Sequence, residues 1–419
     1  MHYLVKGTFF DTPTQNEIRT RTGYLEVKDG KCVTFCEQRK EEWKQLEIHD
    51  HTGKMILPGF TDLHLHAPQY NFCGCAMDLQ LLEWLNEYTF PEEAKFQDLN
   101  YAKESYKHFV HDLLHSVTTR CCVFGTIHTE ATIELMEQLE KSGLISYVGK
   151  VCMNRNSPDN YTEHTTNIGI QNTSHWLEEC KKHNFKNTKP IITPRFTPSV
   201  TDTYMEALGK ISQEQNLSVQ SHLSENTDEI KWVHELCPET ENYAETYDRY
   251  GLLKKNTIMA HCVHTTTKEK DLLKNKGVYI AHCPTSNEDL ASGIAPAAYY
   301  LRNGFHIGLG TDVAGGHTLN LLEVITAAIQ CSKLRYVYID QCEKPLTLEE
   351  AFYIATVGGG SFFGKVGLFE EGYDFDAVIV DDHELKSPRE CSNKDRLERY
   401  AYQGSGKVTD KYVAGEKVL

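Results

Sequence analysis

Two histidines separated by one leucine lie in the otherwise apolar stretch "GFTDLHLHAPQY". Residues two apart in a strand share a face, so Asp62, His64 and His66 are expected to point the same way. Leu63 and Leu65 then point to the opposite face, where they can pack against helices. A single strand histidine is more often a core residue with satisfied hydrogen bonds. A pair on one face at the end of a strand instead favours a metal or catalytic site.

Three motifs further along the chain supply compatible groups at the ends of candidate strands. They are "QSHLSEN", with His222 and Glu225, "MAHCV", with His261, and "GLGTDVAGG", with Asp312. Neutral imidazoles and a carboxylate suit a divalent zinc or iron ion. Such an ion makes its bound water far more acidic than bulk water, so a metal-bound hydroxide is the expected nucleophile. The glycines after Asp312 are expected to let the backbone turn and approach a ligand.

Other residues of the same types are weaker candidates. His282 and His306 also lie on candidate strands, and Cys283 and Asn287 follow the former. We expect that these residues contribute, at most, to the shape of the pocket. Most of the remaining histidines lie in polar helical or loop surroundings, which predicts exposure to solvent.

Segments typical of buried strands recur through the middle of the chain and alternate with segments of helical periodicity. The strand candidates are residues 59–67, 117–127, 146–155, 190–196, 217–225, 257–263, 277–284 and 305–313. Parallel strands need crossover helices, and a closed ring of such units leaves no sheet edge. The sequence therefore predicts an α/β fold with a TIM-like (β/α)8 barrel over residues 59–369. Barrel enzymes build their sites at the carboxyl ends of the strands, which is where the histidine and aspartate motifs lie.

The two ends of the chain have a different pattern. Both contain short alternating segments with turn signals, as in "GYLEVKDGKCVTF" and "YDFDAVIVDD". Neither end is long enough to form a β-domain easily by itself. We therefore expect residues 1–58 and 370–419 to form one small β-sandwich together.

The composition restricts the class of partner. The formal net charge of the 419-residue chain is −16, which argues against nucleic acid or an anionic membrane as a partner, because both reward a basic surface. A small-molecule partner fits better. No run approaches the roughly 20 apolar residues that a membrane-spanning helix needs, and the first residues match neither a secretory leader nor a transit peptide. A cytoplasmic protein with its 14 cysteines as reduced thiols is expected.

The order of the motifs resembles that of a known family. "PGFTDLHLHA", "SHLSEN", "AHC", "HCPTSN" and "GTDVAGG" follow one another over residues 58–316 as they do in the amidohydrolase superfamily of metal-dependent hydrolases. "GLFEEGYDFDAVIVD" is similar to the return of that superfamily's chain to its small β-domain. The resemblance spans nearly the whole chain and implies a metal-dependent hydrolase.

Within the superfamily, "HAPQYNFCG", "PRFTPS" and "HLSEN" resemble the branch that deaminates guanine. This resemblance implies hydrolysis of guanine to xanthine and ammonia by a homodimer with one metal ion per subunit. The implied zinc ligands are His64, His66, His222 and Asp312. The implied catalytic residues are Glu225, as the proton shuttle, Asp312, and His261, which bonds the metal-bound water. The implied contacts to the purine come from His66, Gln69, Arg195, Phe196, His222, Glu225 and Asp312.

The chemistry of these residue types agrees with the implied roles. Deamination needs a nucleophile at the amine-bearing ring carbon and protons for the ring nitrogen and the departing nitrogen, and Glu225 can move those protons. Arg195 offers a planar donor fork that suits a purine carbonyl, whereas its alternative interpretation is a structural arginine. Phe196 could equally be a core residue. No lysine stands at the end of the fourth strand as a two-metal site would require, so a mononuclear site is favoured.

Several alternatives remain open at this stage. Another member of the superfamily would act on an adenosine-type, pterin or triazine amine or on a cyclic amide, and a barrel without activity would serve as a scaffold. Zinc-dependent base-flipping deaminases are excluded because their cysteine motif is missing. Zinc and ferrous iron accept similar ligands, so the sequence does not separate them. Residues 71–96, rich in aromatic and acidic side chains, are the candidate lid or wall of the pocket.

Overall fold

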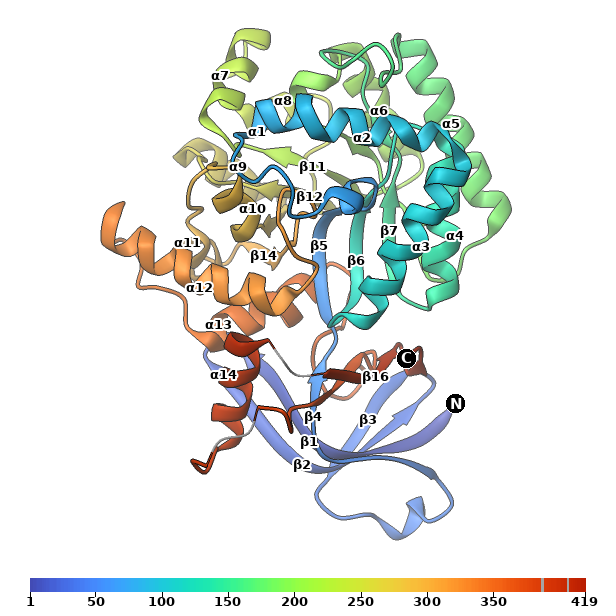
Figure 1. Ribbon diagram of the computed structural model, residues 1–419, viewed down its shortest axis with the longest axis vertical. Helices are drawn as coiled ribbons and strands as arrows, with labels where there is room; N and C mark the ends of the chain where they lie inside the picture. The colour runs from blue at the N-terminus through green and yellow to red at the C-terminus, as the bar shows by residue number, and fades with distance from the viewer. Residues whose placement is uncertain (386–387, 405–406) are drawn as a thin grey trace.

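The computed structural model describes residues 1–419 except 386–387 and 405–406. A helix-covered sheet forms the larger part of the molecule, and a second sheet that contains both ends of the chain lies below it (Figure 1). Among the residues described, no helix is long and apolar enough to cross a membrane. The structure pairs none of the 14 cysteines.

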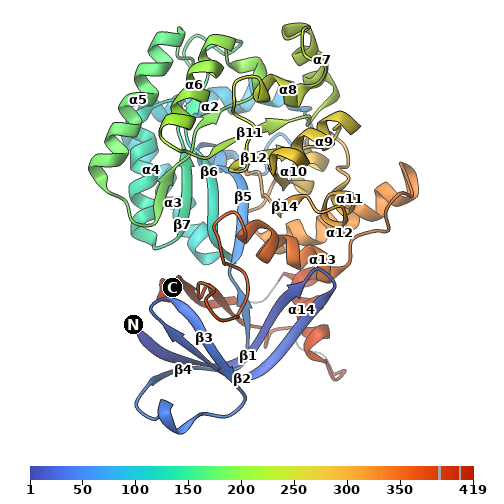
Figure 2. The same cartoon turned by 180° about the vertical axis from the view of Figure 1, so that it is seen from behind.

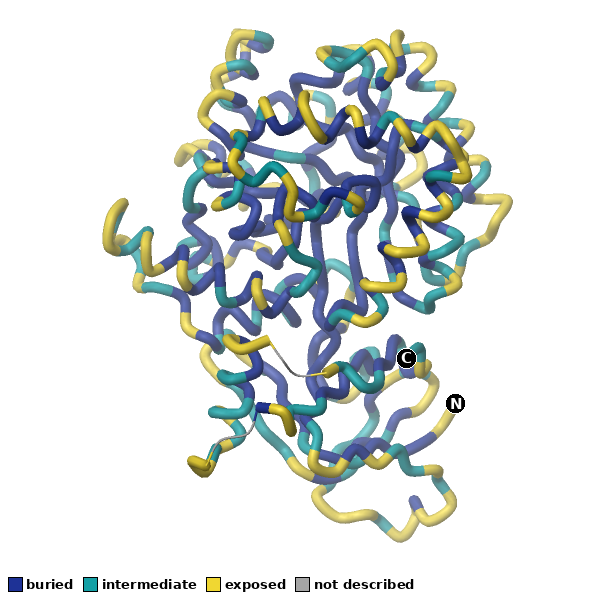
Figure 3. The backbone as a smooth tube through the Cα atoms, viewed as in Figure 1, coloured by how far each residue is buried: buried dark blue, intermediate teal, exposed yellow. Residues whose placement is uncertain are grey.

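The larger part is built on an eight-stranded parallel sheet. In spatial order its strands are β11 (Val219–Leu223), β12 (Thr257–His261), β13 (Tyr279–His282), β14 (His306–Leu309), β5 (Phe60–His66), β6 (Thr118–Phe124), β7 (Ile145–Gly149) and β9 (Thr188–Pro190). Their residues are almost entirely buried (Figure 3). This confirms the predicted α/β class with parallel strands.

The two outer strands of this sheet, β9 and β11, approach each other through a single bridge. Ile192 pairs with Val219, and the Ile192 N–H donates to the Ser218 carbonyl at 2.9 Å. The strand predicted over residues 190–196 is divided, and only its first residue belongs to β9. Its remainder, β10 (Thr193–Pro194), pairs with β8 (Val151–Cys152) in a separate short sheet.

The helices of the chain surround the parallel sheet, except the last one, which lies beside the terminal sheet (Figure 2). They are α1 (Leu81–Trp84), α2 (Phe90–Ala94), α3 (Leu99–His115), α4 (Thr129–Ser142), α5 (Thr166–His183), α6 (Asp202–Glu214), α7 (Thr227–Leu236), α8 (Tyr243–Asp248), α9 (Thr267–Lys276), α10 (Pro284–Asp289), α11 (Ala297–Arg302), α12 (Leu321–Tyr338), α13 (Leu348–Tyr353) and α14 (Asn393–Gln403). Local signals fix several of their ends. A capping box at Thr266 begins α9, and the left-handed Gly277 ends it.

Strand β5 departs from the alternation that its sequence predicts. Its register against β6 shifts between Asp62 and Leu65, as in a β-bulge. Leu63 packs in a cluster with Ala260 and Ala281, whereas Leu65 belongs to the large core cluster. The Asp62 carboxylate accepts bonds from the N–H and the hydroxyl of Thr311, at 3.1 and 2.6 Å. The prediction that Asp62 shares a face with the histidines, opposite both leucines, is therefore wrong.

The ends of the chain join in one seven-stranded sheet. Its order is β17 (Glu416–Lys417), β16 (Lys407–Val413), β15 (Ala377–Asp381), β4 (Glu47–Pro58), β1 (His2–Thr14), β2 (Glu17–Lys28) and β3 (Lys31–Cys36). Asp29 and Gly30 form the tight turn between β2 and β3 with φ of 51° and 81°. The composite origin of this sheet is as predicted. The strands form one hydrogen-bonded sheet, so a sandwich of two sheets is not confirmed.

A buried ionic cluster, which we call the base cluster, joins β6 to the terminal sheet. Arg120 Nε donates to Asp376 Oδ2 at 2.7 Å, and its Nη2 donates to Asp376 Oδ1 at 3.0 Å and to Asp374 Oδ2 at 2.9 Å. The neighbouring Lys411 is fully buried, and its Nζ donates to the carbonyls of Leu113 and Thr118 at 3.3 and 2.8 Å. Both basic side chains of the base cluster therefore donate to fixed acceptors within the protein.

Candidate active site

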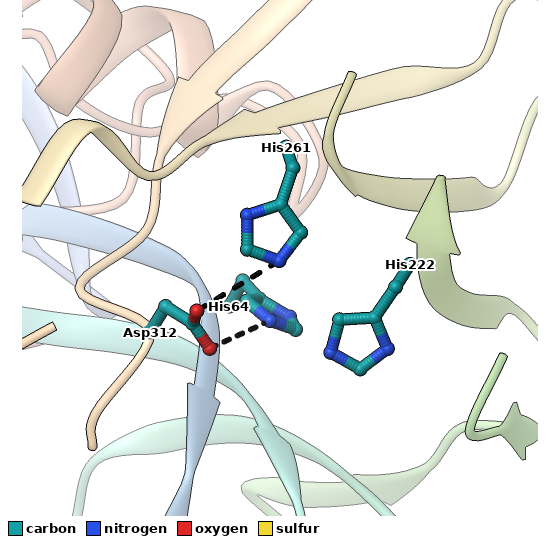
Figure 4. Close-up of side chains that lie close together, drawn as sticks. All are labelled: His64, His222, His261 and Asp312. Atoms are coloured by element: carbon teal, nitrogen blue, oxygen red, sulfur yellow. Dashed lines mark ion pairs between the residues drawn. The ribbon is translucent and has the colours of Figure 1, made fainter. Parts of the chain in front are cut away.

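Side chains from four strand ends converge at the carboxyl end of the parallel sheet. His64 and His66 come from β5, His222 from β11 and His261 from β12, and Asp312 follows β14. Figure 4 shows His64, His222, His261 and Asp312 pointing toward one another. One ligand atom from each of these four lies within 4.8 Å of the others.

His66 belongs to the same cluster. Its Nε2 lies 3.3 Å from His64 Nε2, 3.2 Å from His222 Nε2 and 3.2 Å from Asp312 Oδ1. His64 Nε2 lies 3.0 Å from the same oxygen of Asp312. The structure thus brings together all the predicted ligands, and it places His261 with them.

The hydrogen bonds of two histidines decide which ring nitrogen faces the cluster. His222 Nδ1 donates to the Arg195 carbonyl at 2.5 Å, and His261 Nδ1 donates to Asn287 Oδ1 at 2.9 Å. An Nδ1–H leaves a lone pair on Nε2 in the neutral ring. Both Nε2 lone pairs therefore point at the common centre, as metal-ligating histidines require.

Burial keeps the imidazoles of His64, His66 and His222 neutral. It lowers the pKa of His66 to about 4, and it lowers the pKa of His64 and takes that of His222 well below the usual value. Burial by itself would raise the pKa of Asp312, but the neighbouring His64, His66 and His261 together outweigh burial, so that pKa lies well below the usual value. Neutral imidazole and ionised carboxylate are the forms that bind metal.

The donor set fits a divalent metal ion. His261 Nε2 is buried without a hydrogen-bond partner among the described residues. Several lone pairs meet at one point with no donor between them, an arrangement that a cation satisfies. Nitrogen and carboxylate oxygen are the ligands that zinc and ferrous iron accept.

The backbone is unusual where two of these donors leave their strands. His261 and Asp312 have φ of 70° and 49°, in the left-handed region that non-glycine residues seldom adopt and that is found at functional sites. A Cβ on Gly315 would lie 2.9 Å from Asp312 Oδ2, and one on Gly316 would lie 2.1 Å from the Thr311 carbonyl. These glycines thus give room to the turn that aims Asp312.

Glu225 faces the cluster from the loop after β11. Its Oε2 lies 3.4 Å from His261 Nε2, and Ser292 Oγ donates to its Oε1 at 3.1 Å. Burial and the charge of Asp312 raise its pKa to about 8. The Glu229 carboxylate accepts the backbone N–H of Glu225 at 3.0 Å and so fixes the loop. Sequence reasoning found Glu225 but missed Glu229 and Ser292, for which no motif gave a signal.

The cluster opens into a pocket whose empty space, about 420 Å³, includes solvent at its mouth. Its wall consists of His66, Gln69, Leu81, Trp84, Leu85, Arg195, Phe196, His222, Glu225, Glu229, His261, Leu290 and Asp312. Figure 1 shows α1, which carries Leu81 and Trp84 of this wall, and α2 running one after the other across the upper ends of the strands. Residues 71–96, the candidate lid or wall, thus contribute Leu81, Trp84 and Leu85 to the pocket.

The predicted purine contacts line the same pocket. Gln69, Arg195 and Phe196 are all buried, and the Phe196 ring packs at 6.1 Å from that of Trp232. Arg195 forms an ion pair with Glu93, with Nη1 2.6 Å from Oε2. Glu93 lies in the acid-rich segment of residues 71–96, but no spacing in the sequence marks it out.

The four weaker candidates from the sequence, His282, Cys283, Asn287 and His306, differ in their relation to the site. Asn287 orients His261, as described above, and Cys283, four residues before Asn287, is buried. His282 is buried, and neither ring nitrogen has a hydrogen-bond partner among the described residues. His306 is exposed and stacks on Tyr279, so the structure does not bring it to the pocket.

Comparison with known proteins identifies the family. The model described as "Amidohydrolase family" matches residues 55–418. The chain belongs to the amidohydrolase family. This agrees with the predicted resemblance and with the metal-ligating donor set at the strand ends, because members of this family depend on metal.

Relatives within the amidohydrolase family match over most of their length. Guanine deaminase of Dictyostelium discoideum is 42% identical over 383 residues, which is 90% of this chain and 85% of the relative. Human guanine deaminase is 36% identical, with 100% of this chain and 96% of the relative covered. The crystal structure of guanine deaminase from C. acetobutylicum with guanine bound in its active site has a TM-score of 0.96 and 43% identity, with 100% of both chains covered.

Proposed function

We propose that this protein is a guanine deaminase, which hydrolyses guanine to xanthine and ammonia. One observation carries the proposal: Glu225, the histidine–aspartate cluster, Gln69 and Arg195 all line a single buried pocket. The relatives at 36–42% identity, all named guanine deaminase, support this substrate.

The donor cluster would hold the metal ion through His64, His66, His222 and Asp312, with His261 beside it. When bound, a divalent ion lowers the pKa of a water molecule and thereby supplies the nucleophile for the amine-bearing ring carbon. In this arrangement His261 and Asp312 would orient the attacking water. Glu225 would act as general base and acid, taking a proton from the water and delivering protons to the ring nitrogen and to the departing amino group. Ser292 and Glu229 hold Glu225 for this task.

The opposite side of the pocket holds the purine. Arg195 and Gln69 would donate hydrogen bonds to its carbonyl oxygen and ring nitrogens, and Phe196 would pack on the ring. His66, His222, Glu225 and Asp312 would contact the reacting end of the substrate. A mostly apolar wall with a few fixed polar groups is the usual design of such sites.

Other parts of the proposal are more detailed than the similarity to related proteins establishes. We propose zinc as the metal, with iron as the alternative, because nitrogen and oxygen donors suit both. A homodimer in the cytoplasm remains a prediction from the sequence. A closed barrel over residues 59–369 is also still a prediction; the Ile192–Val219 bridge supports closure between β9 and β11. The same holds for a terminal sandwich built from residues 1–58 and 370–419.

A substrate panel tests this function. Ammonia release would be measured with guanine, adenine, adenosine, cytosine, pterins and triazines on the purified protein, and the metal content would be measured on the same sample. Rapid turnover of guanine with about one zinc per chain is the expected result. Rapid turnover of another amine without guanine turnover would favour the alternative aminohydrolases. A stably metal-free protein without activity would favour the scaffold.

A further inference from the structure

The Glu93 carboxylate ties together the two polar residues that are proposed to hold the purine. Glu93 is 1% exposed and lies on α2. Gln69 Nε2 donates to its Oε1 at 2.7 Å. Arg195 Nη1 donates to its Oε2 at 2.6 Å, and Nη2 donates to its Oε1 at 3.1 Å. Three segments that are far apart in the sequence thus meet on one carboxylate.

These contacts leave the Gln69 amide a single orientation. Its Nε2 faces the carboxylate of Glu93, and its Oε1 accepts the Ala314 N–H at 3.1 Å. An ionised carboxylate only accepts hydrogen bonds and a backbone N–H only donates them, so a flipped amide would lose both bonds. Gln69 therefore has one N–H left on Nε2 that it can donate to a ligand in the pocket.

Two side chains of α2, Phe90 and Glu93, contact Arg195. Its guanidinium lies 5.0 Å from the centre of the Phe90 ring, and Phe90 is three residues before Glu93, on the same side of the helix. Since Arg195 and Glu93 are almost fully buried, each charge depends on the other for compensation.

We infer that Glu93 is a positioning and specificity residue of this pocket. It fixes Gln69 and Arg195 as hydrogen-bond donors, and it cancels the charge of Arg195, so that the pocket selects a neutral purine over an anionic one. This inference rests on the proposed function. Xanthine is a stronger acid than guanine, so near neutral pH part of it is an anion. A guanidinium without its carboxylate would retain this product.

The test compares substrate and product in the metal-loaded full chain. Glu93→Gln keeps the size of the side chain but removes its charge. We expect KM for guanine to rise and inhibition by xanthine to tighten, so that the ratio of KM to the xanthine inhibition constant increases about tenfold or more. A merely structural role would lower activity without moving this ratio. Glu92→Gln is the matched control, because Glu92 bonds to Asn71 and Lys95 instead, and its ratio should stay unchanged.

Two further variants keep the test decisive if Glu93→Gln folds poorly. Glu93→Asp retains the charge with a shorter reach, so KM should rise while the ratio stays near that of the wild type. Arg195→Met leaves the pocket negative, so xanthine inhibition should weaken more than guanine binding. Failure of the wild type to deaminate guanine would overturn the proposed function. Wild-type activity with the same ratio in Glu93→Gln and Glu92→Gln would overturn this inference alone.

Discussion

The molecule contains two buried clusters of charged and polar side chains at opposite ends of the parallel strands. In the base cluster, the guanidinium of Arg120 and the ammonium of Lys411 each meet acceptors that belong to the protein. In the active-site cluster, by contrast, the acceptor atoms of His64, His222 and His261 face one another without a donor. Both clusters are buried. The difference is whether the protein completes the hydrogen bonds itself, and the incomplete cluster is the one built for a ligand.

The largest effect should come from Glu225→Gln. It keeps the metal donors but removes the proton carrier, so kcat should fall about 10²–10⁴-fold. Turnover and metal content would be measured on the same preparation, with the free energy of unfolding as a check on folding. Undiminished activity would remove the proton-shuttle role, and loss of metal would assign Glu225 to metal binding instead.

Arg120→Met should show the opposite pattern in the base cluster. It leaves the buried Asp376 without a cation, which is expected to lower the free energy of unfolding by about 3–5 kcal/mol. The folded fraction should keep its kcat. Urea unfolding measures the loss, and Lys31→Met is the control, because its pair with Asp374 is exposed and should contribute about 1 kcal/mol at most. Equal losses in the two variants would contradict the distinction.

Asn287→Ala tests whether the active-site cluster depends on its supporting hydrogen bonds. Without the Asn287 acceptor, His261 is free to change tautomer, so kcat should fall about 10–100-fold. Asn287→Asp, which keeps an acceptor for Nδ1, should retain more activity. Asn303→Ala, which removes a bond to the Tyr299 carbonyl away from the pocket, is the control. Full activity of Asn287→Ala would show that His261 needs no such support.

The last effect is a gradual one and concerns Lys411 and pH. Burial lowers its pKa from 10.5 to about 7 in the folded protein, so folding releases a proton above pH 7. The resulting penalty is fully present below pH 7 and is relieved as the pH rises toward 10.5. The contribution should amount to about 1 kcal/mol per pH unit. The difference in unfolding free energy between the wild type and Lys411→Met, measured from pH 7 to 10, isolates it, and a pH-independent difference would contradict it.

Several features of this protein could be predicted from the sequence because they depend on local pattern. The alternation of strands and helices indicated the parallel α/β sheet, and each metal donor lies in a short motif at a strand end, as His222 and Asp312 do. The composite terminal sheet followed from the similar pattern at the two ends of the chain. Glu225 was also identifiable, since it lies three residues after His222.

Tertiary structure decided what depends on register and on contacts between distant segments. The bulge in β5 sends Leu63 and Leu65 to different clusters, and no period-two pattern reveals where a ladder gains a residue. Glu93, Gln69 and Arg195 meet only because α2 crosses the ends of the strands. The contacts of two arginines likewise decide their different roles. Arg120 is structural because it pairs with Asp374 and Asp376, and Arg195 lines the pocket because it pairs with Glu93. The sequence by itself determined which chemical groups are available at each strand end. The packing of remote segments decided which groups satisfy one another and which are left to bind a ligand.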